Sequence, residues 1–356
     1  MLRPLFTRPA AIAVAILCAL TAFASAGRAA SADDTLSIVT GAPTTGLFDL
    51  IEDVAAGAGF YKAEHLNIIK EFSSGAGTAA QLAASGKADM CVLSFDPILI
   101  GYDKGLHLQA FLSRQSRYSY MLAVLSDSPV RTLTDLKGKT VGEPTFGGST
   151  EALIRSILGG AGLKPTDYDI TAIGYAGANL AAVTSHHVDA TVDIFSNLMT
   201  NEMQANVKYR IFRDPILDSI PNVGWAAQPS VLAAKNDAFK RFTRAIVEAS
   251  VFVRADPQAA AKIYLQSQGK PFTPDQLAAT THIVTLLEGE LPAADPSNPR
   301  IGLVSPRNFD LYSRTLVEYG FMKNPIPGNQ IATDEFIAYA NDFDRKAVQA
   351  LAHKMH

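Results

Sequence analysis

Cysteine is scarce in this sequence of 356 residues, which contains only Cys18 and Cys91. If the N-terminal segment with Cys18 is removed, one cysteine remains, and an intramolecular disulfide is impossible. Charge is also low: charged residues make up 18% of the chain, and 31 basic residues face 34 acidic ones without a strong basic run. Because nucleic-acid binding needs a clustered positive surface, we exclude that class and expect no nucleic-acid partner.

Long apolar runs are absent apart from one near the N-terminus. Residues 10–23 are apolar except for Thr21, and they follow the positive charges of Arg3 and Arg8. With the small residues that come next, this layout is typical of a secretory signal peptide. About 14 apolar residues are too few for an uncleaved anchor, which needs roughly 20 to span a bilayer. We therefore expect residues 1–30 to be a signal peptide that is removed on export.

Motifs of common catalytic and metal sites are missing as well. The sequence has no zinc-type Cys/His set, no Gly-x-Ser-x-Gly, no Walker loop and no Gly-x-Gly-x-x-Gly after a predicted strand. His186 and His187 are neighbours in a predicted turn, where their side chains point apart, so a turn is favoured over a metal site. We expect no catalytic residue, no metal and no cofactor.

What the sequence does contain is an internal repeat. GAPTTG at 41–46 matches GEPTFG at 142–147. Each motif follows a short β-type run and precedes apolar residues at helical spacing, and each helix ends in a glycine cluster, as a left-handed C-cap requires. The order strand, loop, helix, strand, helix, strand thus occurs twice, and it predicts two related α/β lobes.

Both lobes are expected to contain a mostly parallel sheet flanked by helices. The predicted strands at 91–95 and 190–195 are almost continuously apolar, which is typical of parallel strands covered on both faces. Ligands of such sheets bind at the carboxyl ends of the strands. The loops predicted there are rich in Gly, Ser, Thr, Asp and aromatic residues. This composition predicts a polar ligand cleft between the lobes.

Domain boundaries follow from the repeat. We predict that residues 33–118 form the first part of lobe 1 and that residues 119–228 form lobe 2. Residues 229–356 then return to lobe 1 and add the C-terminal helices. The strand-like runs 118–125 and 224–233 are the predicted crossings between the lobes.

The predicted ligand-binding residues are those at the strand ends and in the adjoining loops. They are Thr44, Thr45, Ser74, Gly75, Ser94, Phe95, Asp96, Tyr118, Gly148, Ser149, Thr150, Tyr175, Asp193, Phe195 and Trp225. The aromatic members can stack on a planar ligand, although core packing is the commoner fate of such side chains, and we expect two of the five to touch ligand. Arg114 and Arg117 either pair with a sulfonate or carboxylate or lie on the surface.

Two groups of these residues suggest a specific chemistry. Gly148, Ser149 and Thr150 open a predicted helix, whose free N–H groups can hold an anion or a carbonyl, unless the hydroxyls only cap the helix. Asp96 and Asp193 follow equivalent strands and can accept hydrogen bonds from a ligand amine or ring N–H. They could also serve as catalytic carboxylates or as caps. We favour binding, because no proton donor and acceptor flank a scissile bond.

Several segments together resemble a known family. They are TGAPTTG, AAGAGFYKAEHLNI, EFSSGAGTAAQLAASGKADM, DSPVRTLTDLKGKTVG and GGSTEALIRSILGGAGL. In this order they are similar to periplasmic substrate-binding proteins of the nitrate/sulfonate/taurine and thiamin-pyrimidine-precursor type. The resemblance implies a type II periplasmic binding protein fold, a periplasmic location, and a monomer that delivers a small-molecule solute to a membrane ABC permease through transient contact.

The sequence departs from this family at two places. The turn that often reads Ser-Gly-Gln is Ser185-His186-His187, and Ile194-Phe195-Ser196-Asn197 replaces the usual acidic contact after the second-lobe strand. The solute is therefore left open between sulfonate, nitrate, pyrimidine and amine. Two alternative functions also remain: a ligand-sensing partner of a membrane receptor, and a pyrimidine-synthesis enzyme on the same fold, although the cysteine-rich motif of those enzymes is absent.

Overall fold

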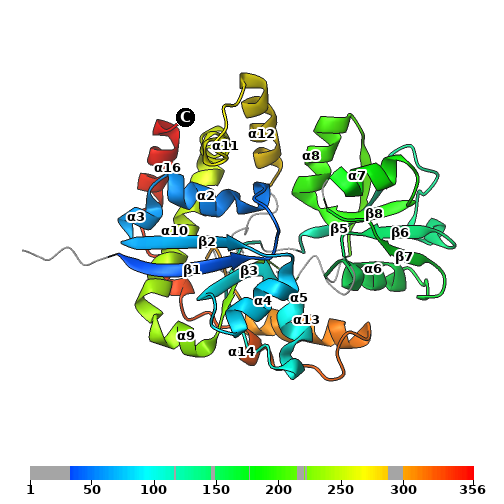
Figure 1. The fold of residues 1–356 in the computed structure, drawn as a ribbon, viewed down its shortest axis with the longest axis horizontal. Helices are drawn as coiled ribbons and strands as arrows, with labels where there is room; N and C mark the ends of the chain where they lie inside the picture. The colour runs from blue at the N-terminus through cyan, green and yellow to red at the C-terminus, as the bar shows by residue number, and fades with distance from the viewer. Residues whose placement is uncertain are drawn as a thin grey trace, which may run out of the picture.

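The computed structural model describes residues 33–115, 118–145, 149–175, 177–214, 220, 223–287 and 300–356. The predicted signal peptide, Arg117 and Gly148 lie outside these ranges. The chain forms two lobes that lie side by side along the long axis, each built on its own sheet (Figure 1). Within the described ranges no helix combines the length and the apolar character that a membrane span requires.

The two sheets have the same architecture. In lobe 1 the strand order is β2-β1-β3-β10-β4, and in lobe 2 it is β7-β6-β8-β5-β9. In each sheet four strands run in the same direction, and the strand at the fourth position runs antiparallel to both of its neighbours. The strands are β1 (Asp34–Thr40), β2 (Leu66–Phe72), β3 (Met90–Ser94), β4 (Gln109–Ser113), β5 (Tyr120–Leu125), β6 (Thr140–Glu143), β7 (Asp169–Ala172), β8 (Ala190–Ile194), β9 (Tyr209–Phe212) and β10 (Val223–Ala227).

The antiparallel strand of each sheet is the one that enters it after a crossing between the lobes. β5 enters lobe 2 after the first crossing, and β10 enters lobe 1 after the return. With β1, β2 and β3 corresponding to β6, β7 and β8, the shared order agrees with the repeat seen in the sequence. The predicted two-lobed α/β fold is confirmed.

The helices are divided unequally between the lobes. Lobe 2 holds η3 (Leu133–Leu136), α6 (Ser149–Gly160), α7 (Gly177–Thr184) and α8 (Phe195–Ala205). Lobe 1 holds η1 (Leu47–Asp49), α2 (Leu50–Gly57), α3 (Phe60–Ala63), α4 (Ala76–Ala84), α5 (Asp96–Ile100), η2 (Tyr102–Lys104), α9 (Pro229–Ala234), α10 (Asn236–Ala255), α11 (Pro257–Ser267), α12 (Pro274–Leu287), α13 (Pro306–Glu318), α14 (Gly328–Ile331), α15 (Ile337–Ala340) and α16 (Arg345–Lys354).

The core of lobe 1 is organised around α10. Phe239, Phe242 and Ile246 repeat at helical spacing on one face and are almost completely buried. The Phe111 ring of β4 meets Phe239 at a centroid distance of 5.1 Å, edge to face. Full burial of each such side chain stabilises the fold by about 1.5–3 kcal/mol. The apolar face of α10 (Asn236–Ala255) is thus what holds this helix against the sheet.

The return crossing lies earlier in the chain than predicted. Lobe 2 was expected to extend to residue 228, but β10 already pairs with β3 and β4 of lobe 1 from Val223 onward. Gly224 explains why this strand fits at the centre of the sheet: a Cβ there would lie 2.1 Å from the Leu112 carbonyl oxygen. The run 224–233 is thus a strand and the helix α9 inside lobe 1, and it is not a crossing.

Candidate ligand site between the lobes

A cavity lies between the lobes at the carboxyl ends of their strands, where α/β sheets usually bind ligands. The space between its walls is about 720 Å³, including space that is open to solvent. We call it the central cavity. Its walls are formed by Thr40, Gly41, Ala42, Phe48, Ala76, Val92, Leu93, Ser94, Arg114, Tyr120, Tyr175, Asp193, Ile194, Asn197 and Val223.

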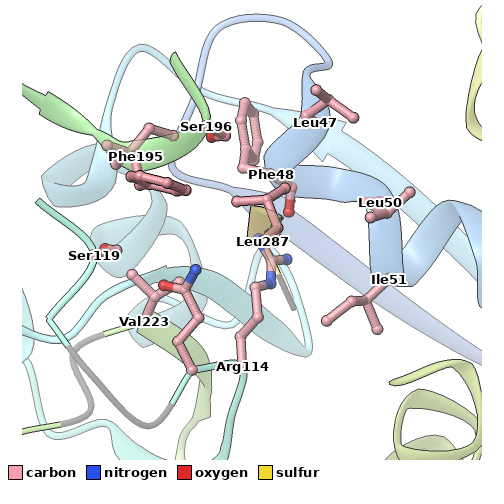
Figure 2. Close-up of a pocket in the computed structure, with 12 residues that line it drawn as sticks. Leu47, Phe48, Leu50, Ile51, Arg114, Ser119, Phe195, Ser196, Val223 and Leu287 are labelled. Carbon is pink, nitrogen blue, oxygen red and sulfur yellow. Dashed lines mark hydrogen bonds between the residues drawn. The ribbon is translucent and has the colours of Figure 1, made fainter. Parts of the chain in front are cut away.

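A second, smaller cavity of about 580 Å³ adjoins the first and is shown in Figure 2. The two share Phe48, Arg114, Ile194 and Val223. We call it the apolar cavity, because most of its remaining walls are hydrocarbon. Its other lining residues are Leu47, Leu50, Ile51, Gln115, Ser119, Phe195, Ser196 and Leu287.

Asp193 is the anionic side chain of the central cavity. It is 2% exposed, and its Oδ1 accepts hydrogen bonds from the Ile194 N–H and the Asn197 Nδ2, both at 2.8 Å. Its Oδ2 is buried and accepts no hydrogen bond from any residue that the structure describes. Burial raises the pKa of this carboxyl to about 6, and its two hydrogen bonds oppose the rise. Buried polar atoms are normally hydrogen-bonded, so this oxygen is a candidate acceptor for a donor that the described residues do not supply.

Aromatic side chains from both lobes line the same cavity. Phe48 comes from lobe 1, and Tyr120 and Tyr175 come from lobe 2. Burial raises the pKa of the Tyr120 phenol well above its usual value, while a hydrogen bond with Ser94 opposes this rise, so the phenol stays neutral. Tyr175 is 40% exposed at the cavity edge. Rings in these positions suit the faces of a planar ligand.

Arg114 stands at the wall between the two cavities and extends toward Phe48 (Figure 2). Its Nη1 donates to the Phe48 carbonyl oxygen, and its Nη2 donates to Glu52 Oε1. The guanidinium carbon also lies 5.1 Å from the centre of the Trp225 ring. The sequence analysis placed Arg114 either against a ligand anion or on the surface. In the structure Arg114 is buried, and it is paired with Glu52.

The predicted ligand-binding residues fall into four groups. Ser94, Tyr175 and Asp193 line the central cavity, and Phe195 lines the apolar cavity. Thr44, Thr45 and Ser74 are exposed in loops of lobe 1, and Gly75 caps α4; none of these four lines either cavity. Gly148 and the Ser149 side chain lie outside the described part of the chain. The remaining residues are buried: Phe95, Asp96, Tyr118, Thr150 and Trp225.

The stacking role that was predicted for three aromatic residues is wrong, because they are buried: Phe95, Tyr118 and Trp225. Phe95 and Trp225 have no exposed surface, and the Phe95 ring packs 5.2 Å from Phe309. Tyr118 is 1% exposed, and its hydroxyl donates to Asp96 Oδ1 at 3.1 Å. These rings fill the core of lobe 1 and its junction with lobe 2. Asp96 is fully buried with them and serves the interior of the protein.

Thr150 is also used inside its own lobe. Its Oγ1 donates to Glu143 Oε2 at 2.6 Å, and Thr150 is 5% exposed. Burial raises the pKa of Glu143 to about 7, although this hydrogen bond favours its ionised form. The Thr150 hydroxyl thus binds the carboxyl group at the end of β6 and not the cavity. A role of Gly148 and Ser149 in holding an anion stays a prediction.

Several cavity residues escaped the sequence analysis. Phe48 stands two residues after the first repeat motif, and Asn197 lies in the first turn of α8, the helix that directly follows Asp193 and the end of β8. Both signals were present in the sequence. Glu52 carried no such signal, because only the fold brings α2 next to Arg114. Within the described ranges no three His, Cys, Asp or Glu side chains gather in a way that could hold a metal ion.

Comparison with known proteins shows which family the chain belongs to. Residues 52–260, more than half of its length, match the model of the NMT1/THI5-like family. The chain belongs to the NMT1/THI5-like family. The resemblance predicted from the sequence motifs is therefore confirmed at the level of the family.

Three individual proteins that the chain resembles share at most about a quarter of their residues with it. The riboflavin-binding protein RibY of Chloroflexus aurantiacus is 24% identical over 293 residues, which cover 80% of this chain and 81% of RibY. A solved structure from Bordetella bronchiseptica is 21% identical with a TM-score of 0.69, over 86% of this chain and 97% of the other. The alkanesulfonate-binding protein SsuA from Xanthomonas axonopodis is 16% identical with a TM-score of 0.65, over 84% and 98%. These structures show that the fold is that of the periplasmic binding proteins.

Proposed function

We propose that this protein is exported to the periplasm, captures a small solute between its two lobes and delivers it to a membrane ABC importer. The family and the fold support this proposal, since the fold is shared with periplasmic binding proteins. So does the position of the central cavity, whose walls come from strand ends of both lobes. A solute held there contacts both lobes at once and so favours the closed arrangement.

The ligand that we propose is an uncharged planar heterocycle that donates a hydrogen bond. The observation that carries this proposal is that Asp193 lines the central cavity and that its buried Oδ2 has no donor among the described residues. A ring N–H or amino group supplies that donor. Phe48, Tyr120 and Tyr175 provide aromatic surface for the faces of such a ring.

The names of two relatives suggest contrasting ligands. RibY is named for riboflavin, whose ring system is planar and carries an N–H between two carbonyl groups; that chemistry matches Asp193 and the aromatic walls. SsuA is named for alkanesulfonates, which are anions. An anion placed beside the Asp193 carboxylate would be repelled by it. A flavin or pyrimidine is therefore our proposal, and a sulfonate is not.

We propose no catalytic role for this site. Cys91 lies in the middle of β3 with no exposed surface, and burial raises the pKa of its thiol to about 12, which removes the nucleophilic thiolate at neutral pH. Ligand sensing through a membrane receptor would use the same cavity. Loss of solute uptake in a deletion strain supports transport; normal uptake with a lost response to the solute supports sensing.

A binding experiment with a matched pair of variants tests the ligand proposal. The mature protein is screened by thermal shift against riboflavin, 4-aminopyrimidine and methanesulfonate, and each hit is measured by calorimetry. Asp193→Asn removes the acceptor charge while keeping the shape, and should weaken binding of a heterocycle about 10- to 100-fold. Asp103→Asn, an exposed aspartate in η2, is the control and should leave affinity unchanged. Equal affinity in the wild type and Asp193→Asn contradicts the proposal.

A further inference from the structure

We propose that Glu52, which does not line either cavity, determines the specificity of the site by neutralising Arg114 and so excluding anions. This inference rests on the proposed function, because it concerns which solutes the central cavity accepts. Arg114 is the cationic side chain among the described residues that line the two cavities, and Asp193 is the anionic one. Whether the site carries positive charge therefore depends on what Arg114 is paired with.

The pair is built into the interior. The Arg114 and Glu52 side chains are 6% and 4% exposed, and Nη2 of Arg114 donates to Glu52 Oε1. Nη1 is occupied by the Phe48 carbonyl oxygen, and the face of the guanidinium lies over Trp225. The positive charge is thus balanced in the absence of any ligand. In a low-dielectric interior that balance is costly to break, because either partner alone is a buried, uncompensated charge.

The charges around Glu52 leave no surplus of positive charge. Lys70 is the other nearby cation, and its Nζ lies 2.6 Å from Asp49 Oδ1 and 3.8 Å from Asp53 Oδ1. Two cations therefore face three carboxylates in this cluster. Tyr61 also faces Glu52, and its phenol is kept neutral because burial raises its pKa. An anionic ligand would meet Asp193 on one side and this acid-rich cluster on the other.

Nε of Arg114 is a buried donor with no acceptor among the described residues, but an anion there gains no net positive charge while Glu52 keeps its charge and its contact. Burial raises the pKa of Glu52 to about 7, and the nearby Arg114 opposes the rise, so protonation near neutral pH is the accessible route. An uncharged heterocycle can bind while Glu52 keeps its charge. It binds at Asp193 and leaves the Arg114–Glu52 pair intact, which also keeps the Phe48 backbone in place as a cavity wall.

Glu52→Gln tests this inference. The amide keeps a hydrogen-bond acceptor for Arg114 but removes the charge, so Arg114 becomes available to an anion. At pH 8 and low ionic strength, calorimetry with methanesulfonate should show at least tenfold tighter binding by Glu52→Gln than by the wild type. Methanesulfonate should also raise the melting temperature of the variant and leave that of the wild type unchanged. The double variant Glu52→Gln/Arg114→Gln should lose the gain.

Two results overturn the inference. One is a wild-type protein that binds methanesulfonate as tightly as Glu52→Gln does; the other is a folded Glu52→Gln that gains no anion affinity. If Glu52→Gln does not fold, it is replaced by Asp193→Asn, a variant that lacks the carboxyl lining the central cavity and keeps Glu52, whose pKa burial raises to about 7, beside Arg114. Its affinity for methanesulfonate should rise between pH 8 and pH 6, and a flat profile overturns the inference. A gain of anion binding without any heterocycle binding would instead retain this inference and reject the ligand proposal.

Discussion

At matching places in the two lobes, an aspartate near the end of the third strand meets two different environments. In lobe 1, Asp96 follows β3 and turns into the interior, where the Tyr118 hydroxyl donates to it. In lobe 2, Asp193 stands one residue before the end of β8 and lines the cavity, and one of its oxygens is buried without a donor among the described residues. Equivalent strands thus place the same carboxyl group in the core of one lobe and at the wall of a cavity in the other.

The difference arises from where each carboxyl stands relative to the strand end. Successive side chains of a strand point to opposite faces, so one or two positions decide between core and cavity. Asp96 lies two residues beyond Ser94, at the start of α5, where it is covered by the core ring of Tyr118. Asp193 is still within its strand, and Asn197 holds only one of its oxygens. The same residue type therefore has opposite consequences when it is replaced.

Replacement of Asp96 should cause the largest loss of stability. Asp96→Ala removes the acceptor of the Tyr118 hydroxyl in a fully buried place, and the free energy of unfolding should fall by about 3 kcal/mol. Urea titration of the ligand-free protein measures this change. A variant that keeps wild-type stability but loses solute affinity would show that the lobe 1 carboxyl also belongs to the site.

Ionisation of the buried Asp193 should make the free energy of unfolding depend on pH. Burial raises the pKa of this group from 3.8 to about 6, so the folded protein holds a proton there that the unfolded chain releases. The contribution of this group to the free energy of unfolding is complete at low pH. It falls by about 2–3 kcal/mol as the pH rises from 4 to 6. Urea titrations at pH 4 and pH 7 should show this loss in the wild type relative to Asp193→Asn. Parallel pH profiles of the two proteins would contradict the burial of the Asp193 charge.

A smaller effect is expected at Thr150, where lobe 2 uses a polar group internally. Thr150→Val leaves the buried Glu143 carboxyl without this donor and should lower the free energy of unfolding by about 1–2 kcal/mol. Affinity for the solute should not change. Thr166→Val, at an exposed threonine, is the control and should stay within about 0.5 kcal/mol of the wild type. If Thr150→Val instead weakens binding, the hydroxyl acts on the ligand, as the sequence had suggested.

Local patterns predicted much of the fold. The apolar runs 91–95 and 190–195 predicted strands, and β3 (Met90–Ser94) and β8 (Ala190–Ile194) are found there to within one residue at each end. β4 and β9 were missed: both are short, and β4 owes its place to pairing with β10, which is more than a hundred residues away in the chain. Such pairing leaves no periodic signal in the strand itself.

The site was predicted less well than the fold, and the reason is geometric. The sequence shows which loops follow the strand ends, and Ser94, Tyr175, Asp193 and Phe195 were found in this way. It does not show which of two neighbouring side chains turns into the core, and this misplaced Phe95 and Trp225. Glu52 and Arg114 are 62 positions apart, so only the folded chain shows that they are paired.

Scattering from the mature protein tests most directly whether the solute is captured between the two lobes. Small-angle X-ray scattering is recorded without ligand and with a saturating amount of the heterocycle that binds most tightly in the screen. Because Phe48 of lobe 1 and Asp193 of lobe 2 both line the central cavity, a ligand bound there as we propose should favour the closed arrangement and give a smaller radius of gyration. An unchanged radius at full occupancy would contradict the account, since it would mean that the solute is bound without drawing the lobes together.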